Sequence, residues 1–180
     1  MSISKLINIQ DYLLSNSVEY FEMIVYSAAS FFIPFLIGHP QIAVGIVVNA
    51  MLITSALNLK GWKVLPIIIL PSVAMLFRGA LFGGFTMFLI YLIPFIWIGN
   101  ALLVFSFKYF RLRLNKNYWL TLIIGALLKS GFLFIASLAL YLLGIIPLFF
   151  LISMGVIQLI TALLGGAAAF GIHSLKKVLC

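Results

Sequence analysis

Negative charge and cysteine are both scarce in this chain. Of its 180 residues only three are Asp or Glu, against eleven Lys and Arg, and the single cysteine is Cys180. One thiol cannot form an intrachain disulfide, and it cannot by itself build an iron–sulfur or zinc–thiolate site. Charged residues make up 8% of the chain and hydrophobic residues 65%. This balance is far from that of soluble domains and indicates an integral membrane protein.

Sequence motifs of nucleotide, metal and acyl-transfer chemistry are absent as well. The chain contains no G-x-x-x-x-G-K-[ST], no H-E-x-x-H and no G-x-S-x-G. We therefore expect no enzyme activity, no catalytic residue, no metal ion and no cofactor. A net charge of +8 would suggest nucleic acid as the partner of a soluble protein. Here the cations lie mostly at the ends of apolar stretches, so we expect a lipid bilayer as partner and no nucleic acid.

Long apolar stretches dominate the chain and predict an all-α fold. A transmembrane helix needs about 20 apolar residues, and six stretches are candidates: 18–38, 41–59, 64–79, 82–107, 118–143 and 146–175. The third is short for a span, or is a broken helix. We expect one transmembrane domain over residues 1–180, with an interfacial helix over 1–17, a six-helix bundle over 18–175 and a cytoplasmic tail over 176–180.

Lysines and arginines alternate between the connections of these spans. They follow the second, fourth and sixth spans, whereas the connections at 39–41 and 144–147 contain none. The positive-inside rule then places both termini in the cytoplasm of a multi-pass protein, which we expect in the plasma membrane. The cations concerned are Lys60, Lys63, Lys108, Arg111, Arg113, Lys116, Lys176 and Lys177.

Residues 3–18 have an amphipathic pattern. Apolar residues such as Leu6 and Leu14 recur near helical spacing, with Lys5 and Asp11 on the other side. The pattern predicts either a helix that lies in the membrane interface or a helical extension of the first span.

The stretch 64–100 is almost entirely apolar but is interrupted in its middle. Prolines occur at positions 66, 71 and 94, glycines at 79, 83 and 84, and Arg78 lies among them. A broken backbone in lipid must be buried in protein or line a wet cavity, so we expect this stretch to line a binding cavity. Arg78 suits bidentate contacts with a carboxylate or phosphate. The alternative is that its side chain reaches the outer headgroups.

Lys129 lies near the middle of the fifth span, far from both headgroup layers. A buried ammonium group needs an anion or a shell of carbonyl and hydroxyl oxygens. Since the spans contain almost no carboxylate, we expect Lys129 to contact an anionic or carbonyl-bearing ligand. The alternative is a bond with backbone at a helix end or with Glu22.

Three amides occur at membrane depth: Asn49, Asn100 and Gln158. Each can orient a polar ligand, and each can equally bond a neighbouring helix. Gln158 is the best ligand candidate because it lies near the middle of its span, and Asn49 is a weaker one. Asn100 follows Pro94 and suits a structural role. Small residues recur with Gln158 on one face of the sixth span, a pattern typical of tight helix packing.

The chain combines several features of one known class of membrane protein. These are six predicted spans with both ends inside, a short first outer loop, no ATPase motif and polar groups toward the outer half. The chain resembles the substrate-binding S-components of energy-coupling factor (ECF) transporters. The resemblance implies a vitamin- or metabolite-binding subunit that works with a membrane coupling subunit and two cytoplasmic ATPases. It also implies a small-residue surface on the first span for the coupling subunit. Residues 27–30 supply small side chains there, but no pair four apart.

Our first hypothesis is therefore a substrate-binding subunit for uptake of a small polar metabolite, which we expect to be anionic. Its expected contacts are Arg78, Lys129 and Gln158, with Asn49 as a weaker candidate. Two alternatives stay open. One is a non-transport membrane scaffold that anchors a partner complex on its basic cytoplasmic face, and the other is a self-contained channel or carrier.

Overall fold

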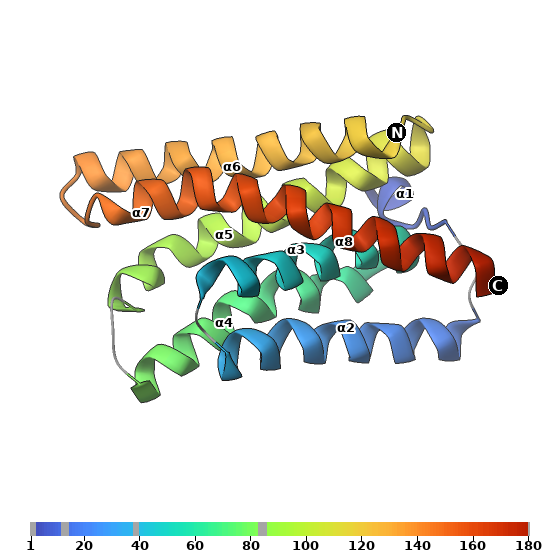
Figure 1. Ribbon diagram of the computed structural model, residues 1–180, viewed down its shortest axis with the longest axis horizontal. Coiled ribbons are helices and arrows are strands. Elements are labelled where there is room, and N and C mark those ends of the chain that lie inside the picture. Colours follow the sequence, from blue (N-terminus) through green and yellow to red (C-terminus); the bar gives the residue numbers. More distant parts are fainter. Residues whose placement is uncertain (1–2, 12–14, 38–39, 83–85, 180) are drawn as a thin grey trace.

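The computed structural model describes residues 3–11, 15–37, 40–82 and 86–179, and its secondary structure there is helical without any strand (Figure 1). The all-α prediction is thus confirmed. After a short α1 (Ile3–Ile7) come six long helical segments, in which η2 and η3 are π-helical. They are α2 (Asn16–Leu36), α3 (Gln41–Asn58), η1 with α4 (Gly61–Val64, Leu65–Phe82), α5 with η2 (Thr86–Ser106, Phe107–Arg113), α6 (Tyr118–Leu142), and α7, η3 and α8 (Phe149–Ile152, Ser153–Ile157, Gln158–Leu179). α8 therefore continues through most of the predicted tail over 176–180.

The long segments run alternately in opposite directions, so that α3 and α8 point the same way (Figure 1). α3 contacts α2, α4, α5 and α8, which makes it the central helix, and nearly every residue from Asn49 to Asn58 is buried. α1, η1 and the last turns of α8 lie at one end of the bundle. We call this the basic end, because it carries Lys60, Lys63, Lys108 and Lys176, and we call the opposite end the far end.

Among the residues that the structure describes, five helices are long and apolar enough to cross a membrane: Gln41–Asn58, Gly61–Gly79, Phe88–Arg113, Tyr118–Leu142 and Phe149–Lys176. Large apolar side chains are exposed on their outer faces, for example Ile135 and Leu142 on α6. The chain is thus a membrane-embedded helical protein. α2, the first of the six predicted spans, has the length of a span but is not among the five. Its first two turns carry Glu19 and Glu22.

The N-terminal segment differs from the predicted amphipathic helix. α1 ends at Ile7, and the residues that follow it leave the helical path. The backbone N–H of Asp11 donates to the Leu57 carbonyl at 2.8 Å, and Lys108 donates to the Ile9 carbonyl. The backbone groups of Ile9 and Asp11 therefore bond to η2 and α3 instead of to a continued α1, and these bonds hold the N-terminal segment against the bundle.

The interrupted stretch 64–100 forms most of α4 and much of α5. The helix α4 is 18 residues long and continues through Pro71, and α5 likewise contains Pro94. The third predicted span is therefore short but unbroken. The predicted interruption at Gly83 and Gly84 lies outside the described residues.

Small residues bring the parallel helices α3 and α8 into close contact. A Cβ added at Gly165 would lie 2.6 Å from the carbonyl oxygen of Ile46, and one added at Gly45 would lie 2.8 Å from Thr161 Cγ2. Both distances are shorter than van der Waals contact, so glycine is what allows the two helices to approach this closely. This is the packing role that the small-residue face of the sixth span predicts.

Candidate functional site

A group of polar side chains lies in the centre of the bundle, at mid-length of α6. Lys129 is 2% exposed, and its ε-amino nitrogen donates to Asn49 Oδ1 at 2.6 Å and to Asn100 Oδ1 at 2.8 Å. The two asparagines belong to α3 and α5 and are themselves 1% and 2% exposed. Three helices that are distant in the sequence thus meet at one amine.

The orientation of both amides is fixed by their own donors. The Asn49 amide nitrogen donates to the Gly45 carbonyl at 2.9 Å and to Thr161 Oγ1 on α8 at 3.2 Å. The Asn100 amide nitrogen donates to the Ile68 carbonyl on α4 at 2.9 Å. With each nitrogen bound in this way, each oxygen is left to accept from the amine. We call the four side chains the lysine cluster: Asn49, Asn100, Lys129 and Thr161.

The negative charge of the chain lies elsewhere. All three acidic side chains are at the basic end, and each is paired there. The pairs are Asp11 with His173 at 3.1 Å, Glu19 with Lys63 at 2.7 Å, and Glu22 with Lys176. One predicted alternative paired Lys129 with Glu22. It is wrong, because Glu22 is paired with Lys176.

The amine of Lys129 keeps one donor for a further partner. An ammonium group has three N–H bonds, and this one makes two hydrogen bonds with the described part of the chain. A carboxylate or carbonyl oxygen that reached the lysine cluster would accept the third. A carboxylate would also bring a full negative charge, whereas the amide oxygens supply only partial charges.

Arg78 lies toward the far end, on the last turns of α4. Its guanidinium donates to the carbonyls of Phe35 and Leu36 at 2.7 and 3.0 Å. These carbonyls belong to the last turn of α2, where helix carbonyls lack intrahelical partners. Arg78 thus caps α2 and is not brought together with Lys129. No sequence pattern indicates this contact, because α2 and α4 become neighbours only in the fold.

Gln158 borders the lysine cluster. Its backbone carbonyl accepts from the Thr161 hydroxyl at 3.2 Å, and its half-buried side chain makes no hydrogen bond with the residues that the structure describes. Nearer the far end, the Gln41 amide donates to Ser153 Oγ in η3 at 2.5 Å. Ser153, Gln158 and Thr161 therefore place polar groups on η3 and the first turn of α8, between the far end and the cluster. Sequence reasoning missed Thr161, although it lies three residues after Gln158, on the same helix face.

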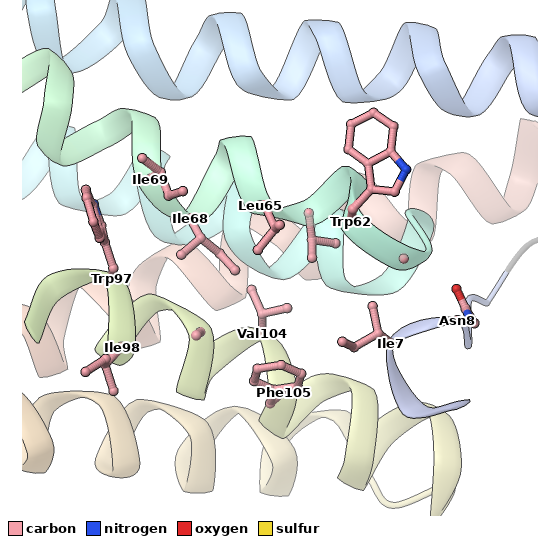
Figure 2. Close-up of a pocket in the computed structure, with 13 residues that line it drawn as sticks. Ile7, Asn8, Trp62, Leu65, Ile68, Ile69, Trp97, Ile98, Val104 and Phe105 are labelled. Atoms are coloured by element: carbon pink, nitrogen blue, oxygen red, sulfur yellow. The ribbon is translucent and has the colours of Figure 1, made fainter. Parts of the chain in front are cut away.

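An apolar groove lies between α4 and α5, toward the basic end (Figure 2). Its volume is about 550 Å³, and the stretch 64–100 supplies six of its thirteen lining residues. The predicted wet cavity around Arg78 is a different one, because this groove is apolar and Arg78 does not line it. Typical lining residues are Ile68, Ile69, Trp97, Ile98, Val104 and Phe105.

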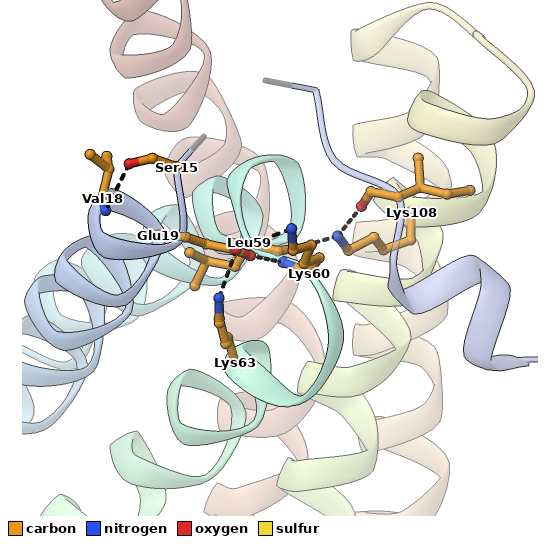
Figure 3. A network of polar contacts seen from close by, with 8 residues as sticks. Ser15, Val18, Glu19, Leu59, Lys60, Lys63 and Lys108 are labelled. Carbon is orange, nitrogen blue, oxygen red and sulfur yellow. Dashed lines mark hydrogen bonds and ion pairs between the residues drawn. The ribbon is translucent and has the colours of Figure 1, made fainter. Parts of the chain in front are cut away.

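Buried charges connect α2, η1 and η2 at the basic end (Figure 3). Glu19 is fully buried, and its two carboxylate oxygens accept from the Lys60 backbone N–H and from Lys63 Nζ, both at 2.7 Å. Lys108 Nζ donates to the Leu59 carbonyl at 2.5 Å and to a carbonyl of the N-terminal segment. Each of these groups is bonded within the protein, so the network fixes the helix ends rather than offering a binding site.

Metal ligands do not gather in the described ranges, where no group of three or more His, Cys, Asp or Glu side chains is placed to hold an ion. No protein-family model matches the chain, and neither a curated protein nor a solved structure is significantly similar to it. Inference about function therefore depends on the lysine cluster and the groove.

Proposed function

We propose that the protein is a membrane-embedded binding subunit for a small metabolite that carries a carboxylate or a carbonyl group. The observation that supports this best is Lys129, which is 2% exposed in the middle of a span, is bonded to two amide oxygens and is distant from every acidic side chain. A lysine at such a depth is costly to bury and is commonly functional. A ligand that pairs with it gives a physical reason for its position.

The members of the site have different parts in this proposal. Lys129 gives its third N–H to the ligand oxygen, and Asn49 and Asn100 hold the amine in place. Gln158 offers an amide that can donate to or accept from a second polar group of the ligand. We do not include Arg78 among the ligand contacts, because its guanidinium donates to carbonyls at the end of α2.

The ligand reaches the lysine cluster from the far end. Gln41, Ser153 and Gln158 lie on that side of the cluster, where the π-helical η3 precedes α8. π-Helical turns inside α-helices are frequent at functional sites. Movement of η3 away from the start of α3 would break the contact between Gln41 and Ser153 and open a path to the amine.

Energy for uptake comes from partner subunits. The chain has no nucleotide-binding motif, and its acidic side chains are already paired at the basic end, so an ion-coupling carboxylate at the lysine cluster is lacking. We therefore keep the arrangement of ECF S-components, with a membrane coupling subunit and two cytoplasmic ATPases. In that arrangement the protein is a multi-pass subunit of the plasma membrane, with both termini and the basic end in the cytoplasm.

Native mass spectrometry of the mildly purified protein tests the proposal. The expected result is a retained small molecule that carries a carboxylate or carbonyl group, together with two ATPase subunits. The variant Lys129→Met should lose the small molecule, because no other group in the cluster can donate to it. Lys116→Met removes an exposed cation at the basic end and should retain it.

Three outcomes would overturn the proposal. Equal retention of the small molecule by Lys129→Met removes the lysine cluster from the binding site. A soluble enzyme complex in place of the ATPases indicates a scaffold. Ion flux through the purified protein alone in vesicles indicates a self-contained channel or carrier.

A further inference from the structure

The apolar groove between α4 and α5 opens to the side of the bundle. Trp62, Leu65 and Ile98 line it and are each about half exposed, at 57%, 49% and 47%. Its walls belong to two of the helices that are long and apolar enough to cross a membrane. In a bilayer this opening therefore faces lipid, and we propose that the groove binds one acyl chain of an anionic phospholipid. The inference does not depend on the function proposed for the lysine cluster.

The wall chemistry suits a hydrocarbon chain. The indole N–H of Trp97 donates to Ser72 Oγ at 2.7 Å, so this ring presents carbon rather than a donor to the groove. Among the described residues, Asn8 is the one amide that lines it, and it lies at the basic end (Figure 2). A polar metabolite would leave its hydrogen-bonding groups unsatisfied along the rest of the groove. The volume of about 550 Å³ lies within the usual range for ligand sites.

Hydrocarbon contacts alone would not select a particular lipid, because every lipid tail in the bilayer is as apolar as the groove. Selection has to come from the headgroup. Trp62 marks the headgroup level, since half-exposed tryptophans at the ends of spans commonly lie in the membrane interface. The headgroup of a lipid whose chain fills the groove therefore lies beside the basic end.

Two lysines with accessible side chains belong to the segments that form the basic end of the groove. Lys60 directly precedes Gly61 and Trp62, which line the groove, and Lys5 is on α1 with the lining residue Ile7. The Lys60 side chain is 39% exposed, and its ammonium forms a long ion pair with Glu19 Oε2 at 3.7 Å. An exposed pair of this length is weak, so the Lys60 ammonium can turn to a lipid phosphate, as can that of the exposed Lys5, and we place an anionic headgroup beside these two lysines.

The buried lysines of the same end do not compete for this headgroup. Lys63 is held by a carboxylate at 2.7 Å with its side chain 7% exposed, and Lys108 is 1% exposed and bonded to backbone carbonyls. Lys5 and Lys60 are therefore the residues to test. Lys116 is an exposed cation at the same end that does not adjoin the groove, so it serves as the control.

Tryptophan quenching by brominated lipids gives a direct test. The full chain is reconstituted in phosphatidylcholine with a small fraction of either dibrominated phosphatidylglycerol or dibrominated phosphatidylcholine. In one variant Trp97 is the single tryptophan, after Trp62→Phe and Trp119→Phe. In the other the single tryptophan is Trp119, which is 47% exposed on α6 and does not line the groove.

Trp97 should be quenched at a mole fraction of brominated phosphatidylglycerol about tenfold lower than that of brominated phosphatidylcholine. Trp119 should respond nearly equally to both. Adding Lys5→Gln and Lys60→Gln to the Trp97 variant should abolish the difference, whereas Lys116→Gln should keep it. Equal quenching of Trp97 by the two lipids overturns the anionic headgroup. A Trp97 that neither lipid quenches overturns occupancy by an acyl chain and leaves a peptide or another molecule as the occupant.

Discussion

The hydrogen bond between Lys129 and Asn100 should stabilise the fold measurably, and a double-mutant cycle isolates it. Lys129→Met removes the amine and keeps an unbranched side chain, whereas Asn100→Leu removes the amide with little change in volume. Each single replacement also leaves other polar groups without partners, so its effect on the free energy of unfolding mixes several terms. The cycle subtracts these terms and leaves the interaction between the two side chains.

The size of the interaction follows from its geometry and its surroundings. The distance is 2.8 Å, and each residue is 2% exposed. Hydrogen bonds to charged groups contribute about 1.5–3 kcal/mol in soluble proteins, but interhelical hydrogen bonds in a membrane protein average about 0.6 kcal/mol and reach about 1.7 kcal/mol. Full burial and a short distance place this bond near the upper membrane value. We expect a coupling energy of about 1.5 kcal/mol, or about a tenfold change in the unfolding constant.

Unfolding titrations with dodecyl sulfate in mixed micelles, followed by circular dichroism, supply the four free energies. A second cycle that combines Lys129→Met with Ser137→Ala serves as the control. Ser137 is fully buried on the same helix about 12 Å further along its axis, so the two effects should add. A coupling energy below about 0.3 kcal/mol for Lys129 and Asn100, no larger than in the control, would refute the claim that the amide holds the amine.

Two further predictions concern close packing and buried charge, and both are measured by the same titration. Gly165→Ala places a Cβ 2.6 Å from a backbone oxygen of α3 and should lower the free energy of unfolding by about 1–3 kcal/mol, whereas Gly171→Ala, with no atom within 4 Å, should change it by less than about 0.5 kcal/mol. Lys63→Met removes the cation 2.7 Å from the buried Glu19 carboxylate and should lower the free energy of unfolding by about 3–5 kcal/mol. Lys60→Met removes a half-exposed cation 3.7 Å from the same carboxylate and should lower it by less than about 1 kcal/mol. Equal losses within either pair would contradict the corresponding argument.

Burial of Lys129 could be predicted from the sequence because it depends mainly on distance along one helix. A lysine in the middle of an apolar stretch of span length cannot reach either headgroup layer, and the side chain is 2% exposed. Its partners could not be predicted in the same way. Asn49 is 80 positions away, and nothing in the spacing of the two residues indicates that α3 and α6 meet at that height.

For Arg78 the local sequence suggested a ligand contact, whereas in the fold this side chain caps α2. An arginine among glycines and prolines suits a ligand site when it is considered alone. In the fold, the parallel packing of α2 and α4 brings it to the free carbonyls of Phe35 and Leu36. The N-terminal segment is similar, since its amphipathic spacing predicts a long helix, whereas the tertiary contacts of Ile9 and Asp11 end it early.

The membrane helices of this protein could be predicted without any knowledge of its fold. Apolar composition and run length are enough for that, because the bilayer requires every backbone group to be bonded within its own helix. Which of the few polar side chains meet depends instead on how the helices pack. Gly45 and Gly165 set how closely α3 and α8 approach, and this approach places Asn49 and Thr161 beside the amine of Lys129. Such contacts depend on helix direction and rotation, which the bilayer does not specify and side-chain packing does.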